Sequence, residues 1–328
     1  MIKIHVDAAT ITAHYTAVRN YFDARKDTPA WIEKVTPGVM DYINTNFQDI
    51  ICGTPEIIME KSIELSQNFD LDRATRDNKS IKKHIRNLIS YENFRDRQHE
   101  FENWHAYTLA DALKVNVCPY CNRQYTSTVI VNDIAGNREY IIKPAFDHFY
   151  CRAIYPVLGL SIYNLIPSCT TCNSTLKGEE DFTLEQYMHP FIEGFDNDGV
   201  FTFTPQNANG FINPENDNVE IRINSTFAQQ AKRERIENNT RFFAINKIYT
   251  ECHIDLLNEI VQKSRENAPE YFDFLIQNFD LATPNALYRY LFSNYLYQED
   301  YLKRPLSKFT KDIATGLGII DRINRLFP

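Results

Sequence analysis

Residues 118–121 read Cys-Pro-Tyr-Cys, and residues 169–172 read Cys-Thr-Thr-Cys. Each pair can present two thiolates to one metal ion from a tight turn or the start of a helix, and four thiolates in tetrahedral geometry are typical of structural zinc. The 47 residues between the pairs exceed the roughly 15 to 20 that separate the pairs of a zinc ribbon, so a folded segment has to lie between them. A redox motif of the thioredoxin type and chance spacing are the alternatives. We expect zinc to be bound by Cys118, Cys121, Cys169 and Cys172.

A site closed by four cysteines leaves no open coordination position, so catalytic chemistry has to come from other residues. Asp147 and His148 stand between the two cysteine pairs. Because successive residues of a regular strand point to opposite faces, these two side chains can serve one site only where the strand bends into a loop. An imidazole of ordinary pKa, about 6.5, can take a proton from water at neutral pH, and a carboxylate is a hard ligand suited to Mg²⁺ or Mn²⁺.

A short helix is predicted around the second cysteine pair. Ser168 is a plausible N-cap and Gly178 a plausible residue just after the C-terminus, which frames about nine helical residues. Cys172 and Asn173 then differ by about 100° around the axis, so one can face zinc and the other a second metal ion. Lys177, four residues after Asn173, lies on the same face, where it could contact a phosphate.

The spacing of these residues resembles that of a known nuclease family. Asp147-His148, fifteen residues, Asn164, eight residues and Asn173 follow one another, with Asn173 directly after the second cysteine pair. This pattern, over about residues 115–195, resembles the HNH endonuclease family in its ββα-metal form. The resemblance implies that His148 is the general base, that Asn164 orients the loop bearing it, and that Asp147 and Asn173 hold one Mg²⁺ or Mn²⁺ ion. Asn173 stands where many members have a histidine, which puts tight metal binding in doubt.

The sequence around the second pair, Asn-Leu-Ile-Pro-Ser-Cys-x-x-Cys-Asn-Ser, further resembles that of PtuB-like HNH nucleases of bacterial anti-phage defence systems. That resemblance implies a DNA-cleaving effector that works with an ATPase partner protein. Two other classes stay open: a zinc finger without catalysis that serves as a nucleic-acid or protein adaptor, and a stand-alone restriction-type nuclease. A metal-dependent cleavage assay separates the adaptor from the enzyme.

The net charge of −8 is concentrated in one stretch. Residues 179–220 contain ten acidic side chains and no Lys or Arg, and the rest of the chain sums to +2. Tight binding of DNA by a protein acting alone usually needs a basic surface, so this balance weakens the restriction-type reading. Residues 73–97 contain eight basic and three acidic side chains. Four of the basic residues, Arg76, Lys79, Lys83 and Arg86, are spaced so that they would share one helical face, which is either a solvated face or a phosphate contact. The expected nucleic-acid contacts are Lys177, Arg152, Lys143, Arg76, Lys79, Lys83 and Arg86.

The overall pattern predicts an α+β protein, mostly helical, with an embedded zinc-stabilised ββα-metal finger. A hairpin is expected from residues 126–131 and 138–146 around a turn at 132–136, and one long helix from Thr226 to about Lys263. A further helix is expected from Pro284 to about Tyr301. The acidic stretch reads as surface loops around residues 201–204 with an edge strand at 219–224, and Cys151 and Cys252 read as buried small side chains.

Four segments follow from these patterns. They are a helical region (1–109), the nuclease domain (110–195), an acidic loop and edge-strand segment (196–224) and a second helical region (225–328). No run approaches the 18 or more apolar residues of a membrane span, and the first residues lack the features of a secretory signal. We therefore expect a cytoplasmic protein without a membrane partner.

Overall fold

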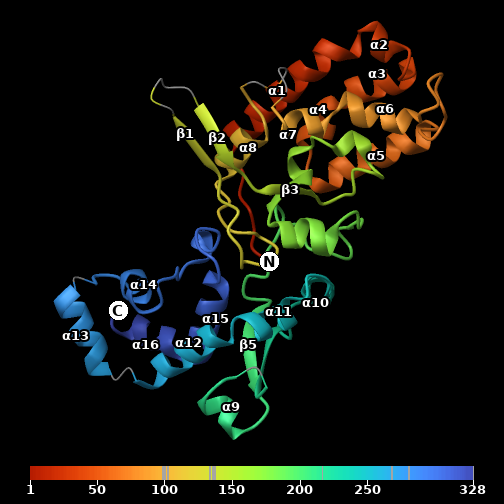
Figure 1. The fold of residues 1–328 in the computed structure, drawn as a ribbon. Helices are drawn as coiled ribbons and strands as arrows, with labels where there is room; N and C mark the ends of the chain where they lie inside the picture. Colours follow the sequence, from red (N-terminus) through yellow and green to blue (C-terminus); the bar gives the residue numbers. More distant parts are fainter. Residues whose placement is uncertain are drawn as a thin grey trace. The chain divides into compact units, whose positions relative to one another are not determined.

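The computed structural model describes residues 1–97, 101, 103–132, 134, 138–215, 217–266, 269–279 and 281–327. Helices make up about half of the chain, and the strands of the described residues form three two-stranded antiparallel sheets (Figure 1). The fold is therefore mixed and consistent with the predicted α+β class. The chain divides into two compact units, which we call the N-terminal unit (residues 4–115 and 126–184) and the C-terminal unit (residues 1–3, 116–125 and 185–328).

Within its described residues, the N-terminal unit has eight α-helices before its strands, and prolines open several of them. Pro29, Pro37 and Pro55 each stand at the first helical position, where the missing N–H costs no hydrogen bond. Apolar side chains such as Val18 and Phe22 form the buried core between the helices. The helices are α1 (Ala8–Lys26), α2 (Pro29–Ile32), α3 (Pro37–Thr45), α4 (Phe47–Cys52), α5 (Pro55–Asn68), α6 (Ile81–Leu88), α7 (Tyr91–Arg95) and α8 (Ala106–Leu113).

The basic segment does not form the single helical face that its spacing predicts. Helix α6 begins only at Ile81, because the Ser80 hydroxyl caps it by accepting the backbone N–H of Lys83 at 3.3 Å. Arg76 and Lys79 precede the helix in a turn, where the Thr75 N–H donates to the Lys79 carbonyl at 2.8 Å. The prediction of one shared face for these four basic residues is therefore wrong, and only Lys83 and Arg86 lie on α6.

Two strand pairs follow α8 in the N-terminal unit. The predicted hairpin is confirmed: β1 (Val129–Asn132) pairs antiparallel with β2 (Arg138–Ile142), although its turn lies partly outside the described residues. The second pair joins β3 (Ala145–His148) to β4 (Leu165–Ser168), with His148 opposite Leu165. Strand β3 ends at His148, as expected for a strand that delivers Asp147 and His148 to one site. Two short 3-10 helices, η2 (Pro156–Leu158) and η3 (Ile162–Asn164), lie between β3 and β4.

The helix after β4 differs from the prediction. It is a π-helix, η4 (Thr171–Lys177), in which the Gly178 N–H donates to the Asn173 carbonyl five residues earlier at 2.8 Å. Ser168 is the last residue of β4 and not the N-cap, which is Thr170. Gly178 ends the helix as predicted, with a φ of 56° that glycine adopts at no steric cost.

The acidic stretch contributes to the core of the C-terminal unit, contrary to the prediction. Residues 201–204 belong to a strand, β5 (Val200–Pro205), which pairs antiparallel with β6 (Val219–Asn224). Phe201, Val219 and Ile221 on this hairpin are all buried. The alternation of these apolar residues with polar ones puts one face of the hairpin inside the unit and leaves the other to carry Glu220 and Arg222.

The long helix predicted from Thr226 to Lys263 is broken into three. Ala244 adopts a left-handed conformation, with a φ of 48°, that ends one helix and begins the next. The helix predicted to reach Tyr301 ends at Phe292 for the same reason, because Ser293 has a φ of 50°. Cys252 is exposed, so its predicted burial is wrong, whereas Cys151 is buried. The helices of this unit are α9 (Ala208–Ile212), α10 (Gln230–Phe242), α11 (Ile245–Cys252), α12 (Ile254–Glu266), α13 (Pro269–Phe279), α14 (Pro284–Phe292), η5 (Gln298–Asp300), α15 (Ser307–Gly316) and α16 (Ile319–Arg325).

Candidate functional site

A pocket of about 370 Å³ in the N-terminal unit collects most of the residues that the motif singles out. Asp147 and His148 reach it from the end of β3, and Asn173 reaches it from η4. The two strands β3 and β4 place these elements together, because β4 leads directly into the turn before η4. Three of the four predicted catalytic residues therefore line one cavity.

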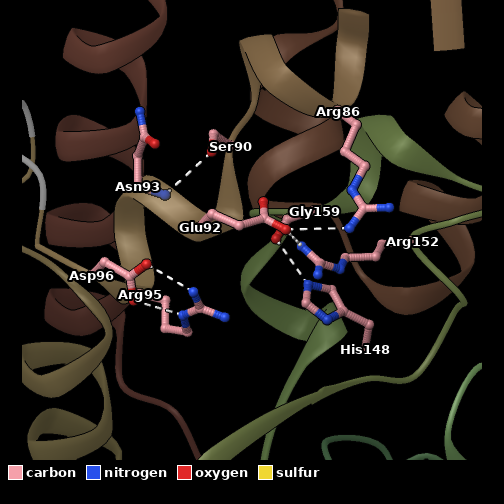
Figure 2. Close-up of polar contacts among 9 residues, drawn as sticks. All are labelled: Arg86, Ser90, Glu92, Asn93, Arg95, Asp96, His148, Arg152 and Gly159. Carbon is pink, nitrogen blue, oxygen red and sulfur yellow. Dashed lines mark hydrogen bonds and ion pairs between the residues drawn. The ribbon is translucent and has the colours of Figure 1, made fainter. Parts of the chain in front are cut away.

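His148 is held in a single neutral form. Its Nε2 atom lies 3.0 Å from the Gly159 carbonyl oxygen, which can only accept, so Nε2 carries the proton and Nδ1 has the lone pair (Figure 2). The ring also meets the edge of Tyr91, with the two ring centres 4.7 Å apart. Burial, with a smaller contribution from the nearby Arg152 charge, lowers the pKa of His148 to about 3, although the Gly159 carbonyl opposes the shift. At neutral pH the imidazole is therefore uncharged, with the Nδ1 lone pair as a hydrogen-bond acceptor, and it is a weaker base than an imidazole of ordinary pKa.

Asp147 is paired with an internal cation. The Lys177 ammonium lies 3.2 Å from Asp147 Oδ1 and donates to the His148 carbonyl at 2.7 Å. Both members of the pair are almost completely buried, with 1% of Asp147 and 2% of Lys177 exposed. Lys177 is thus the counter-ion of Asp147 and fixes the end of β3, whereas the prediction assigns it to a phosphate. To contact a phosphate, the Lys177 ammonium would have to bind the phosphate and Asp147 at the same time.

Asn164 lies outside the described lining of the pocket and supports the loop that follows His148. Its side-chain oxygen accepts the Tyr150 N–H at 2.8 Å, and its amide nitrogen donates to the Tyr150 and Leu158 carbonyls, both at 3.1 Å. The residue is fully buried. Three hydrogen bonds from one side chain to a loop backbone restrict where the loop and the adjoining His148 can lie. This geometry suits an orienting role.

The lining of the pocket also contains several basic side chains. Arg86 of α6 and Arg152 both contact Glu92 Oε1 of α7, at 3.2 and 2.8 Å (Figure 2). Arg95 and Lys143 add two more cations to the lining, and the Arg95 guanidinium is also paired with Asp96 at 2.7 Å. Burial and the neighbouring Arg95 charge lower the pKa of Lys143. Of the basic residues predicted to contact nucleic acid, the lining contains Arg86, Lys143 and Arg152, whereas Arg76, Lys79 and Lys83 are exposed outside its described part.

Sequence reasoning missed the residues that α7 contributes. Tyr91 and Arg95 line the pocket and Glu92 holds its arginines, yet none belongs to a motif. The only local signal is the capping Ser90, whose hydroxyl accepts the Asn93 N–H at 3.2 Å and marks a helix start. A helix start in the sequence says nothing about which distant strand the helix will face.

The cysteine pairs form a compact group of sulfur atoms. The Cys118 carbonyl accepts the N–H of Asn122 at 2.8 Å, which closes a tight turn around the first pair. In the second pair the Cys172 N–H points to the Cys169 sulfur at 3.4 Å. All four Sγ atoms lie within 4.8 Å of one another, and all four residues are buried. Zinc–sulfur bonds of about 2.3 Å place tetrahedral ligands roughly 3.8 Å apart, so the group could hold a metal ion such as zinc.

The oxygen donors of Asp147 and Asn173 fit a hard divalent cation by their chemistry. Carboxylate and amide oxygens are the ligand types that Mg²⁺ and Mn²⁺ take, usually together with water and substrate phosphate. The Lys177 ammonium already neutralises Asp147, so a cation there would share that carboxylate with the lysine.

Comparison with protein-family models, with curated proteins and with solved structures gives no match to this chain. Within the described residues, we find no helix with the length and apolar character that crossing a membrane requires. Any assignment of function therefore depends on the chemistry of the pocket.

Proposed function

We propose that the protein is a metal-dependent HNH endonuclease that hydrolyses phosphodiester bonds in DNA. The observation that carries the proposal is the pocket itself, in which Asp147, His148 and Asn173 share one lining with the cationic side chains of Arg86, Arg95, Lys143 and Arg152. An uncharged imidazole beside hard oxygen donors suits the activation of water, and guanidinium groups suit the binding of phosphate. The strand–strand–helix order of β3, β4 and η4 supports the HNH assignment.

The reaction assigns one task to each side chain. His148 Nδ1 takes a proton from water as the water oxygen bonds to phosphorus, and the bond from phosphorus to the 3′ oxygen breaks with its electron pair on that oxygen. Asp147 and Asn173 would hold one Mg²⁺ or Mn²⁺ ion, which supplies charge stabilisation at the phosphate and the leaving oxygen. Asn164 restricts the loop after β3 and so orients His148.

The cysteine group would have a separate, structural task. Four thiolates close the coordination of zinc, so a bound ion there stabilises the fold and takes no part in hydrolysis. We further propose that the enzyme is an effector of a bacterial anti-phage defence system and acts with an ATPase partner. The support for the defence role and for the ATPase partner is the sequence motif at residues 164–174 alone.

A plasmid-nicking assay with Mg²⁺ or Mn²⁺ tests the proposal. His148→Ala should slow cleavage about 10² to 10⁴-fold, the usual contribution of a positioned general base, while DNA binding persists. His5→Ala is the matched control, because His5 is exposed and does not line the pocket. Equal rates for both variants, or wild-type protein that binds DNA without cutting it in either metal, would favour the adaptor function instead.

A further inference from the structure

Three side chains outside the motif form an ion-pair cluster at the pocket wall. Arg86 and Arg152 come from different parts of the chain and meet on one oxygen, Oε1 of Glu92. Figure 2 shows both guanidinium groups converging on that carboxylate beside the His148 ring. One carboxylate balances two guanidinium groups, so the cluster keeps a net charge of +1.

We propose that Arg86 and Arg152 together bind one phosphate group of the substrate next to His148, and that Glu92 is the positioning residue that holds them. This inference deepens the proposed function and rests on it for the identity of the polymer. The phosphate would be distinct from the one that Asp147 and Asn173 address.

The contacts leave donors for such a ligand. A guanidinium carries five N–H donors in a rigid fork, far more than a contact with one Glu92 oxygen uses, and both arginines also line the pocket. Glu92 itself stays ionised: burial would raise the pKa of its carboxyl, but its own backbone N–H and the two arginines hold that pKa below the usual value. The net positive charge would not attract a neutral ligand, whereas phosphate oxygens would accept hydrogen bonds from both guanidinium groups.

The cluster is coupled in space to the predicted catalytic base. Arg152 lies over the face of Tyr91, with its guanidinium carbon 5.1 Å from the ring centre, and the same ring meets His148 at 4.7 Å. Tyr91 is almost fully buried, so its ring is a fixed spacer between the arginine pair and the imidazole. A phosphate bound by the arginines would therefore set the position of the neighbouring nucleotide relative to His148.

Two sources could supply this phosphate: an internal phosphodiester of a strand or a terminal phosphate group. Both present anionic oxygens to the same donors. We therefore design the test with 3′-fluorescein duplexes that carry either a 5′-hydroxyl or a 5′-phosphate. Binding is measured by anisotropy at several salt concentrations without added Mg²⁺ or Mn²⁺, so that no cleavage interferes.

Arg86→Gln and Arg152→Gln should each weaken binding and reduce the slope of log K against log salt by about one, because each removes a phosphate contact. Arg73→Gln is the matched control, since Arg73 is an exposed arginine of the same unit outside the described lining, and it should keep the wild-type slope. Loss confined to the 5′-phosphate duplex would identify a terminal phosphate, and equal loss on both duplexes an internal one. Slopes for Arg86→Gln and Arg152→Gln that match Arg73→Gln would overturn the proposal.

Glu92→Gln separates positioning from a purely structural role. The amide can still accept from both arginines but carries no charge, so the cluster rises to a net +2 and should bind the duplex several-fold more tightly with a steeper salt slope. Glu92→Ala removes the same charge and also the acceptor that holds the two guanidinium groups, so weaker binding by Glu92→Ala than by Glu92→Gln supports positioning, and equal binding by the two variants would refute it. Tryptophan fluorescence during urea unfolding checks that each variant is folded, and Arg152→Lys, which keeps the charge but not the fork, should preserve the slope while weakening binding.

Failure of the nuclease proposal gives a different pattern. If wild-type protein neither binds nor cuts DNA, inorganic phosphate becomes the probe, measured by calorimetry on the intact chain. Phosphate binding that Arg86→Gln abolishes and Arg73→Gln leaves intact supports the site without the polymer. No phosphate binding by the wild-type protein overturns the site as well.

Discussion

The titration of His14 gives the protein a stability that depends on pH. His14 is completely buried on α1, and its Nε2 atom donates to the Leu160 carbonyl at 2.8 Å. Its Nδ1 atom accepts from the indole N–H of Trp104 at 3.1 Å, so this nitrogen cannot also carry a proton without two donors facing each other. Burial lowers the pKa of His14 to about 4, although the Leu160 carbonyl opposes the shift.

The sign of the effect follows from proton linkage. An unfolded chain binds a proton at His14 below its ordinary pKa of about 6.5, whereas the folded chain stays neutral down to about 4. Falling pH therefore stabilises the unfolded state within this window, and the protein loses stability on acidification. A shift of about 2.5 pKa units corresponds to roughly 3 kcal/mol, most of it lost by about pH 4.5.

Urea unfolding followed by tryptophan fluorescence measures this loss, because both tryptophans, Trp31 and Trp104, lie in the same unit as His14. His14→Gln removes the titration, so the free-energy difference between wild type and variant should shrink by about 2.5 kcal/mol between about pH 7.5 and about pH 4.5. His5→Gln, at an exposed position, should leave the pH dependence as in the wild type. A wild-type-minus-variant difference that is the same at both pH values would refute the reasoning.

Three further expectations concern the cysteine group and the pocket. Cys172→Ser should lose zinc and unfold its surroundings, since structural zinc contributes on the order of 10 kcal/mol in small domains, while Cys252→Ser at an exposed position should keep the wild-type metal content by elemental analysis. Lys177→Met should lower the free energy of unfolding by about 3–5 kcal/mol, because it removes the ammonium that pairs with the buried Asp147. In a double-mutant cycle with Asp147→Asn, the two losses of stability should be less than additive, and additive losses would contradict the pairing. Asp147→Ala and Asn173→Ala should raise the Mg²⁺ or Mn²⁺ concentration needed for half-maximal cleavage, and unchanged metal dependence in both would exclude them as ligands.

The sequence predicts those parts of the protein in which chemistry dictates the residue type. The group of four thiolates is recognisable because few other residues can bind zinc in this way, and the strand that ends at His148 is found where the motif places it. The antiparallel hairpin at 129–142 follows in the same way from its β-branched runs. Helix ends were harder to predict, because Ala244 and Ser293 take left-handed conformations that neither residue type favours.

The sequence names Arg86, Lys143 and Arg152 as basic contacts, but their meeting in one pocket and around Glu92 could not be predicted, because that geometry is tertiary. Arg86, Glu92 and Arg152 resemble any surface charges in the sequence, and the last two are separated by 60 positions. Only the tertiary fold, which brings α6, α7 and the loop after β3 together, turns them into a cluster with a shared oxygen. The contacts of Lys177 likewise depend on tertiary geometry, and its spacing from Asn173 predicts them only on the assumption of an α-helix.

In the π-helix η4 the hydrogen bonds span five residues, so its turn is wider than the α-helical turn on which the spacing argument for Asn173 and Lys177 is based. Lys177 instead reaches inward to Asp147 and to the His148 carbonyl, which couples the end of the helix to the end of β3. The lysine that sequence spacing assigns to the substrate therefore has an internal task, which is to fix the carboxylate and the strand end on which the proposed chemistry depends. If the proposed phosphate site is correct, recognition depends on the arginines held by Glu92, and the Arg86 and Arg152 variants, not Lys177 variants, are therefore the informative test of substrate binding.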